Sequence, residues 1–349
     1  MKTTFVSTIA LTESTRLSLM KAQAKLAGAQ KEMSTGRYSD VGIGLGFRAG
    51  ESVSLRQDHA RLSTIRDTNG LVTTRLDATQ AVLETISDDA EAFLSALNAS
   101  RESDSGPQVI QVEARTRLES MINGLNIEIE GAYIFSGIDV NSSPISAYFA
   151  EPPPASRQSV ADAFFTTFGF AQSDPAAANI SAADMKAFLD GPFAALTEEP
   201  SWSTNWSNAS DQNIRSRIST TEMAETSTNA NIKPLRDLFS AYSMIADLGV
   251  GELSEAAYKE VVDKAAALIN STVVQLSGVR ANLGTAQERV STASERMSIQ
   301  IDILSQHVTQ LEGVDPYEAS TRVTSLLTQI EVSYALTARL QNLSLLNHL

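Results

Sequence analysis

Several residue types and patterns are missing from this sequence, and each absence excludes a class of protein. The 349 residues contain no cysteine, which excludes disulfides, thiol nucleophiles and zinc–thiolate sites. The three histidines are His59, His307 and His348, and none has a neighbouring ligand at the short spacing of a helical metal site. The sequence therefore predicts neither a metal nor a cofactor.

The common phosphate-binding and catalytic motifs are also absent. The sequence contains no GxxxxGK[ST] string and no GxSxG string. The glycine-rich stretch VGIGLGFRAG at 41–50 does not fit GxGxxG, because the frame places Phe47 where a glycine is needed. We interpret this stretch as a hinge between two helices. The sequence predicts no catalytic residue and therefore no enzyme.

Positive charge and long apolar runs are scarce as well. The formal net charge is -14 and no run of lysine or arginine occurs, so we predict no nucleic-acid partner and no membrane partner. No apolar stretch approaches the ~20 residues that span a bilayer. Near the N-terminus, Thr3, Thr4, Ser7 and Thr8 interrupt the apolar run that a cleaved signal requires. We expect a chain that is cytoplasmic or is exported without a cleaved signal.

Prolines and aromatic residues gather in the middle of the chain. Eight of the ten prolines lie between Pro144 and Pro234, and both tryptophans lie in the same stretch. The flanks contain almost no helix breakers. This distribution indicates helical flanks and an inserted middle region.

The N-terminal flank carries a long helical repeat. Apolar residues from Leu62 to Leu97 step by three or four positions, which is typical of a coiled-coil-like helix. We predict a helix over 52–98, roughly 70 Å long at 1.5 Å per residue. Asn69 is polar within this seam, and such residues commonly fix the register. A second helix is predicted after Pro107, with Leu118, Ile122, Leu125, Ile129 and Ala132 on one face.

The C-terminal flank repeats this pattern over a predicted helix at 255–312, which Gly313 and Pro316 would end. Its length suits antiparallel packing against the helix at 52–98. The rod-seam residues on the two helices are Leu62, Ile65, Asn69, Val72, Leu76, Leu83, Leu283, Val290, Met297, Ile301 and Leu304.

Two amphipathic helices are predicted at the ends of the chain, over 5–34 and 316–346. Their apolar faces have few partners within the chain, so we expect them to be buried between subunits. An apolar last residue, Leu349, supports this expectation because chain ends are usually polar. The predicted subunit-interface residues are Phe5, Ile9, Leu17, Met20, Val323, Leu326, Ile330, Leu340, Leu343 and Leu346.

These patterns predict a mainly α fold. A long antiparallel coiled-coil-like rod carries a smaller inserted α+β or β-rich outer domain. We place a terminal helical domain at 1–40 plus 314–349, a rod domain at 41–137 plus 253–313, and the inserted domain at 138–252. We expect short strands and turns in the inserted domain, one helix near 182–197, and irregular chain or a short strand at 213–230.

Three strings carry a resemblance to a known family. They are QKEMSTGRYSDVG at 30–42, DTNGLVTTRLDATQAVLETI at 67–86 and ANLGTAQERV at 281–290. With helical ends, a variable middle and no cysteine, the chain resembles the bacterial flagellins. Within that family, GAYIFSGIDVNSSPI at 131–145 and ARLQNLSLLNHL at 338–349 are similar to the subunits that join hook and filament. VGIGLGFRAG departs from the acidic, alanine-rich stretch of filament flagellins.

The resemblance implies a structural role in the bacterial flagellum. It implies an extracellular location reached through the flagellum-specific type III export channel. It also implies assembly with copies of itself, with an upstream hook-associated junction protein, with flagellin or the filament cap, and with an export chaperone. Terminal helices would order on assembly and line the inner tube. The alternatives are a filament flagellin, a secreted coiled-coil effector or translocator, and an enzyme in the middle domain.

Overall fold

The computed structural model describes residues 8–101 and 106–346; the side chains of residues 8, 9, 11, 12 and 340–346 lie outside the description. The fold is mainly α, as predicted, and divides into two compact units. One unit comprises residues 1–64 and 296–349, and the other comprises residues 65–295. The bounds of the three predicted domains differ from these units and stay a prediction.

The predicted long helices are present. The helix α9 (Glu255–Glu312) and the helix α10 (Pro316–Leu346) have the predicted bounds. The helix α3 (Ala49–Ser100) begins three residues before the predicted start and ends two residues after the predicted end. The helix α1 spans Thr8–Thr35. Uninterrupted apolar spacing and clear terminators made these helices predictable.

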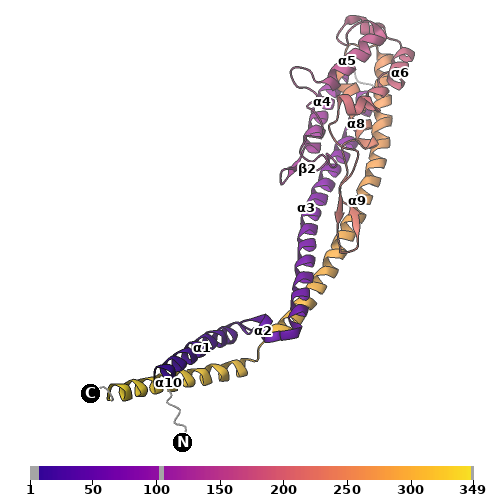
Figure 1. Ribbon diagram of the computed structural model, residues 1–349. Helices are drawn as coiled ribbons and strands as arrows, with labels where there is room; N and C mark the ends of the chain where they lie inside the picture. The colour runs from indigo at the N-terminus through magenta and orange to yellow at the C-terminus, as the bar shows by residue number, and fades with distance from the viewer. Residues whose placement is uncertain (1–7, 102–105, 347–349) are drawn as a thin grey trace. The chain divides into compact units, whose positions relative to one another are not determined.

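In the unit formed by residues 65–295, α3 and α9 run side by side in opposite directions (Figure 1). Asn69 of α3 bonds Ser294 of α9. Gln80 lies further along α3 and bonds the carbonyl of Arg280, which lies earlier in α9, so the two helices run antiparallel. Leu76 lies between these contacts and Leu83 lies just beyond them, and neither of these apolar seam residues is exposed to solvent. This is the predicted antiparallel packing.

The helix after Pro107 is shorter than predicted. The helix α4 (Gly106–Leu125) ends before Ile129 and Ala132, which lie instead in the strands β1 (Glu128–Ile129) and β2 (Ala132–Tyr133). The two turn residues, Glu130 and Gly131, both have positive φ, at 52° and 78°. That conformation reverses the chain into a tight hairpin, whereas the apolar spacing alone predicted a continuing helix.

The inserted region contains more helix than the sequence predicted. Its helices are α5 (Ala155–Phe168), α6 (Ala182–Asp190), α7 (Ser201–Asn205) and α8 (Lys233–Asp247), with 3-10 turns η2 (Pro175–Asn179) and η3 (Ala194–Thr197). The helix predicted near 182–197 is therefore α6 followed by η3.

The helix α8 lies at the centre of this region and packs against α4. Leu238, Phe239 and Met244 have no solvent exposure. Pro234 sits in the first turn of α8, where proline is tolerated because its missing N–H would have no helical partner. The frequent proline and aromatic residues of this region predict short strands and turns instead.

The described strands in this unit are few and short. The strands β3 (Arg215–Arg217) and β4 (Met223–Glu225) pair in antiparallel register, with Ser216 opposite Ala224. They occupy the stretch 213–230, where the sequence predicted irregular chain or a short strand. Ile218 and Ala224 are buried, so the hairpin belongs to the core of the unit.

The other unit contains α1 and α10, which lie side by side (Figure 1). Between α1 and α3, the glycine-rich stretch forms the short helix α2 (Val41–Leu45) and the 3-10 turn η1 (Gly46–Arg48). The unit also includes the first residues of α3 and the last residues of α9.

Candidate assembly surfaces

The pair of terminal helices, α1 and α10, is held by small side chains and a few polar bonds. Ala22 and Ala29 of α1 are buried, and two hydrogen bonds set the direction. Gln23 Nε2 donates to Tyr334 Oη at 2.9 Å, and Arg322 Nη1 donates to Glu32 Oε2 at 2.9 Å. Because 23 meets 334 and 32 meets 322, the helices are antiparallel. Small residues such as Ala22 and Ala29 let the helices approach closely.

The predicted subunit-interface residues divide into three groups. Val323 and Ile330 are buried, and Leu326 is half-buried. Leu17 is 51% exposed and Met20 is 47% exposed. Phe5 lies outside the described residues, as do the side chains of Ile9, Leu340, Leu343 and Leu346. Their role between subunits stays a prediction.

The rod-seam residues are mostly buried. Ile65 and Leu304 are half-buried, and the other nine seam residues are buried. Asn69 has no exposure, and its Nδ2 donates both to the Ile218 carbonyl at 2.9 Å and to Ser294 Oγ at 3.0 Å. This side chain therefore joins α3, α9 and the β3–β4 hairpin. The sequence singled out Asn69 for register but could not name the hairpin as a partner.

Large exposed apolar side chains are concentrated in the unit that contains the chain ends. Thirteen such side chains are described there, against seven in residues 65–295, although the second unit has about twice as many residues. The thirteen are Leu17, Met20, Met33, Ile43, Phe47, Val53, Ile299, Ile303, Tyr317, Leu327, Val332, Tyr334 and Leu336. Exposed apolar surface of this density marks an interaction surface or an aggregation liability.

A buried carboxylate, that of Glu312, accepts several hydrogen bonds at the C-terminal end of α9. The side chain of Glu312 has no solvent exposure. Ser52 Oγ donates to its Oε1 at 2.5 Å, Arg56 Nε donates to the same oxygen at 2.7 Å, and Arg56 Nη2 donates to Oε2. The Arg56 hydrogen bond, with help from Ser52, holds the pKa of Glu312 below its usual value despite burial. We call Glu312, Ser52 and Arg56 the joint cluster.

Backbone bonds tie the end of α1 to the same place. The Tyr38 N–H donates to the Glu312 carbonyl at 3.0 Å, and the Val314 N–H donates to the Gly36 carbonyl at 3.0 Å. Gly36 has a φ of 66°, which suits the residue after a helix end. The joint cluster was missed from the sequence, because one sequence does not pair residues so far apart.

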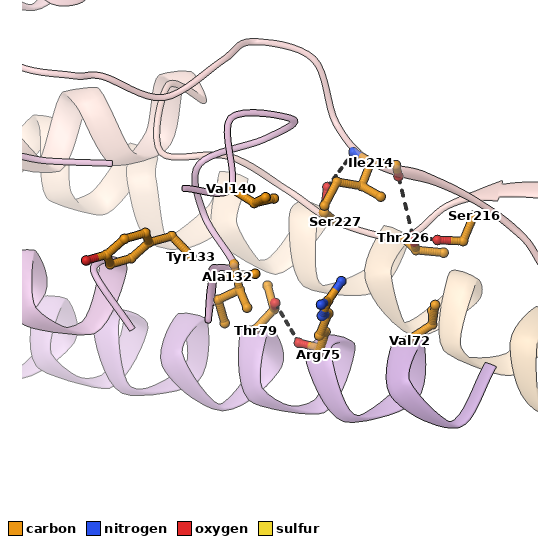
Figure 2. A pocket seen from close by; sticks show the side chains of 11 residues that line it. Val72, Arg75, Thr79, Ala132, Tyr133, Val140, Ile214, Ser216, Thr226 and Ser227 are labelled. Atoms are coloured by element: carbon orange, nitrogen blue, oxygen red, sulfur yellow. Dashed lines mark hydrogen bonds between the residues drawn. The ribbon is translucent and has the colours of Figure 1, made fainter. Parts of the chain in front are cut away.

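A small cavity lies between α3 and the two hairpins (Figure 2). Its volume is about 20 Å³, and Val72, Arg75 and Thr79 of α3 line it together with Tyr133 and Ser216. A cavity of that size holds about one water molecule, whereas a small-molecule site takes roughly 300–1,000 Å³. The surrounding hydroxyls bond within the protein: Thr79 Oγ1 donates to the Arg75 carbonyl at 2.8 Å, and Ser227 Oγ accepts from the Ile214 N–H at 2.8 Å.

A largely buried carboxylate, Asp247, lies in the inserted region, where an enzyme would need a titratable group. Burial raises the pKa of Asp247 above its usual value. Tyr148 Oη donates to its Oδ2 at 3.1 Å, and Arg157 Nε donates to its Oδ1 at 3.3 Å. Tyr148 is itself buried and stacks on Trp206 at 5.4 Å between ring centroids. Both oxygens of Asp247 are therefore engaged inside the fold, which fits a structural role.

Metal-binding clusters and membrane-spanning helices are absent from the described residues. They contain no group of three or more histidine, cysteine, aspartate or glutamate side chains that could hold a metal ion. Within the same residues, no helix has both the length and the apolar character that a membrane span requires.

Comparison with known proteins identifies the family. The sequence model of the bacterial flagellin N-terminal helical region matches residues 6–140, and that of the C-terminal helical region matches residues 266–349. Together they cover more than half of the chain. This chain is a member of the flagellin family. The resemblance stated from the two flanks is thereby confirmed.

Solved structures resemble this flagellin-family chain in fold. A flagellar hook-associated protein from Vibrio parahaemolyticus aligns with a TM-score of 0.51 at 9% identity, over 76% of this chain and 97% of that chain. Bacillus cereus FlgL aligns with a TM-score of 0.42 at 11% identity, over 75% of this chain and 99% of that chain. No curated protein sequence matches this chain.

Proposed function

We propose that this chain is a hook-associated protein 3, the structural subunit that joins the hook-side junction protein to the flagellin filament. The observation that carries the proposal is the concentration of exposed apolar side chains in the unit built from the two chain ends. The flagellin models match both of these ends. A family of self-assembling subunits provides a reason for a surface that a lone chain leaves in water.

Assembly would supply the apolar packing that the terminal helices lack. In the described part of α1, the buried apolar side chains are Ala22 and Ala29, whereas Leu17 and Met20 stay exposed. Isolated helices are marginal in water, and most helix stability in proteins comes from packing of an apolar face. Neighbouring subunits would supply that packing, which offsets the entropy lost on ordering. The predicted interface residues Leu17 and Met20 would be covered in this step.

The motif GAYIFSG supports the junction assignment within the family. It forms β2 and the turn after it, at the point where the chain leaves α4 for the inserted region. Phe135 is fully buried, and Ser136 Oγ donates to the Tyr133 carbonyl at 2.9 Å. Gly137 has a φ of 65°, and a Cβ there would lie 2.4 Å from the Ser210 carbonyl oxygen. Phe135, Ser136 and Gly137 therefore fit the local structure at this exit from the rod.

The remaining predictions are part of the same proposal. The subunit would work outside the cell in the flagellum and reach it through the type III export channel with an export chaperone. Its partners would be copies of itself, the upstream hook-associated protein, and flagellin or the filament cap. The proposal assigns no catalytic residue, cofactor, nucleic acid or membrane.

Gene deletion with electron microscopy tests this function. We expect cells with bare hooks and unassembled flagellin in the medium, because no subunit would connect hook to filament. A plasmid copy of the gene should restore filaments and serves as the control. Normal hooks and filaments in the deletion strain would contradict the proposal, and loss of the filament protein itself would favour the filament-flagellin alternative.

A further inference from the structure

The cavity in Figure 2 contains a positively charged side chain and no negatively charged one. Arg75 is the charged residue among the described residues that line it, and the others are apolar or carry a hydroxyl group. All of these residues belong to the unit formed by residues 65–295. A guanidinium has five N–H donors and no acceptor, so the cavity offers positive charge and hydrogen-bond donors to whatever fills it.

One of these donors, the Nε–H of Arg75, has no acceptor. The Nε atom is buried, although the residue as a whole is half-buried, and no described atom accepts a hydrogen bond from it. Figure 2 shows the side chain extending from α3 toward the chain segment that carries Thr226 and Ser227. Buried donors in native proteins almost always have a partner, which can be an ordered water or an ion. The free donor therefore marks a site for a ligand.

The charge of Arg75 is also unpaired, which separates it from similar arginines. Arg236 and Arg280 likewise have a buried Nε without an acceptor. Arg236 Nη1, however, lies 3.2 Å from Glu198 Oε2, and Arg280 Nη2 lies 3.3 Å from Glu84 Oε1. Within the described residues, no carboxylate forms an ion pair with Arg75. A negatively charged ligand would supply the missing counter-charge.

A hydroxyl group at the same cavity provides a second donor. Ser227 Oγ accepts from the Ile214 N–H at 2.8 Å, and no described atom accepts the hydroxyl hydrogen of Ser227. Thr226 Oγ1 donates to the Ile214 carbonyl at 3.4 Å, so its bond with Ser216 Oγ, at 2.7 Å, uses the hydrogen of Ser216. Of the serine and threonine hydroxyls described at the cavity, that of Ser227 is therefore free to bind a ligand together with Arg75.

The size and charge of the cavity select the ligand. A volume of about 20 Å³ accommodates one water molecule or one monatomic ion, and it is too small for sulfate, phosphate or an organic acid. A water molecule would bring two hydrogens that need acceptors, whereas a halide ion only accepts hydrogen bonds. A charge inside a protein is stabilised when it is paired and hydrogen-bonded. The unpaired guanidinium and the free hydroxyl therefore favour a halide ion over water.

We propose that this cavity binds one chloride ion, which accepts hydrogen bonds from Arg75 Nε and from the Ser227 hydroxyl. The ion would hold α3 to both hairpins, because Tyr133 of β2 and Ser216 of β3 line the same cavity. Neither membership of the flagellin family nor the proposed junction role requires this ion.

Amide hydrogen exchange of the 349-residue chain in solution tests the proposal. Sodium chloride replaces sodium gluconate at constant ionic strength, because the organic gluconate ion is too large for the cavity. We expect exchange in β3 and β4 to slow as chloride binds, roughly tenfold at ten times the dissociation constant, since the ion binds only the closed hairpin. Arg75→Met should abolish this chloride dependence. Arg280→Met is the matched control and should keep it, because Arg280 does not line this cavity.

Crystals of the native chain grown in bromide provide a second measurement that does not depend on any variant. Bromide should give an anomalous-scattering peak beside Arg75 Nε. Water at that position would overturn the proposal, as would equal exchange rates in chloride and gluconate or a chloride dependence retained in folded Arg75→Met. A bromide peak without any chloride dependence in solution would mean binding at crystal concentration only, which also overturns it.

Discussion

At the scale of single residues, Glu312 connects several segments of its unit, and no sequence pattern indicated this role. Its carboxylate receives bonds from Ser52 and Arg56, and its carbonyl receives the Tyr38 N–H. Removing one partner of a buried charge leaves the other uncompensated, which usually costs more than a lost surface pair. Arg56 is half-exposed, so water would replace part of its contribution.

The substitution Arg56→Met tests this contact. It removes both guanidinium bonds and keeps an apolar stem, so we expect the opening free energy at the end of α9 to fall by about 1–3 kcal/mol. Amide hydrogen exchange at residues near Glu312 measures that energy. Arg48→Met is the control, because its partner Glu51 is exposed and the pair is worth at most about 0.5 kcal/mol. If the two substitutions lowered this opening free energy equally, the bonds from Arg56 to Glu312 would not stabilise the end of α9 more than an exposed ion pair does.

The pKa of Glu312 predicts a pH dependence at the same place. Because the folded pKa lies below the usual value of 4.5, the stabilisation is complete above pH 4.5 and is lost as the pH falls through the folded pKa. Exchange rates near Glu312, corrected for intrinsic pH effects, should be steady from pH 7 to about 5 and then rise relative to those of Glu312→Gln. Asp247 has the opposite sign, since its raised pKa favours the folded state as pH falls, but it lies in the other unit.

At the scale of elements, one buried side chain attaches the β3–β4 hairpin to the rod. Asn69 Nδ2 serves both the Ile218 carbonyl and Ser294 Oγ. The hairpin has only three paired positions, which gives it little stability of its own. An ion pair from Arg289 Nη2 to Glu222 Oε1 at 2.8 Å adds a second attachment, although both partners are exposed. The buried bond therefore matters more than the ion pair.

Asn69→Leu should loosen the hairpin selectively. It leaves the buried Ile218 carbonyl without a donor, which costs about 1–3 kcal/mol, so we expect amide exchange in β3 and β4 to accelerate by about 5- to 150-fold. Thr272→Val is the control, because Thr272 is equally buried on α9 but bonds the Pro234 carbonyl instead. Unchanged hairpin exchange in the Asn69 variant would show that apolar packing of Ile218 and Ala224 suffices.

At the scale of the whole molecule, the sequence predicted what regular spacing encodes. The long helices followed from three- and four-residue steps, and Gly313 and Pro316 marked the end of α9. The β1–β2 hairpin was missed because Ile129 and Ala132 continue a helical spacing, while the decisive signal was Glu130–Gly131 with positive φ. The joint cluster was missed because a single sequence does not show which distant residues pair.

The position of the joint cluster along the chain has a consequence for the order of folding. Ser52 and Glu312 are 260 residues apart in the sequence. A chain that emerges from one end cannot make this bond until almost everything between the two residues has also emerged. Long-range contacts form late because loop closure must precede them. The joint cluster can therefore form only after the chain has emerged through residue 312. A subunit truncated before that residue could form helices, but it could not form the cluster or offer neighbouring subunits the end of α9 that the cluster holds.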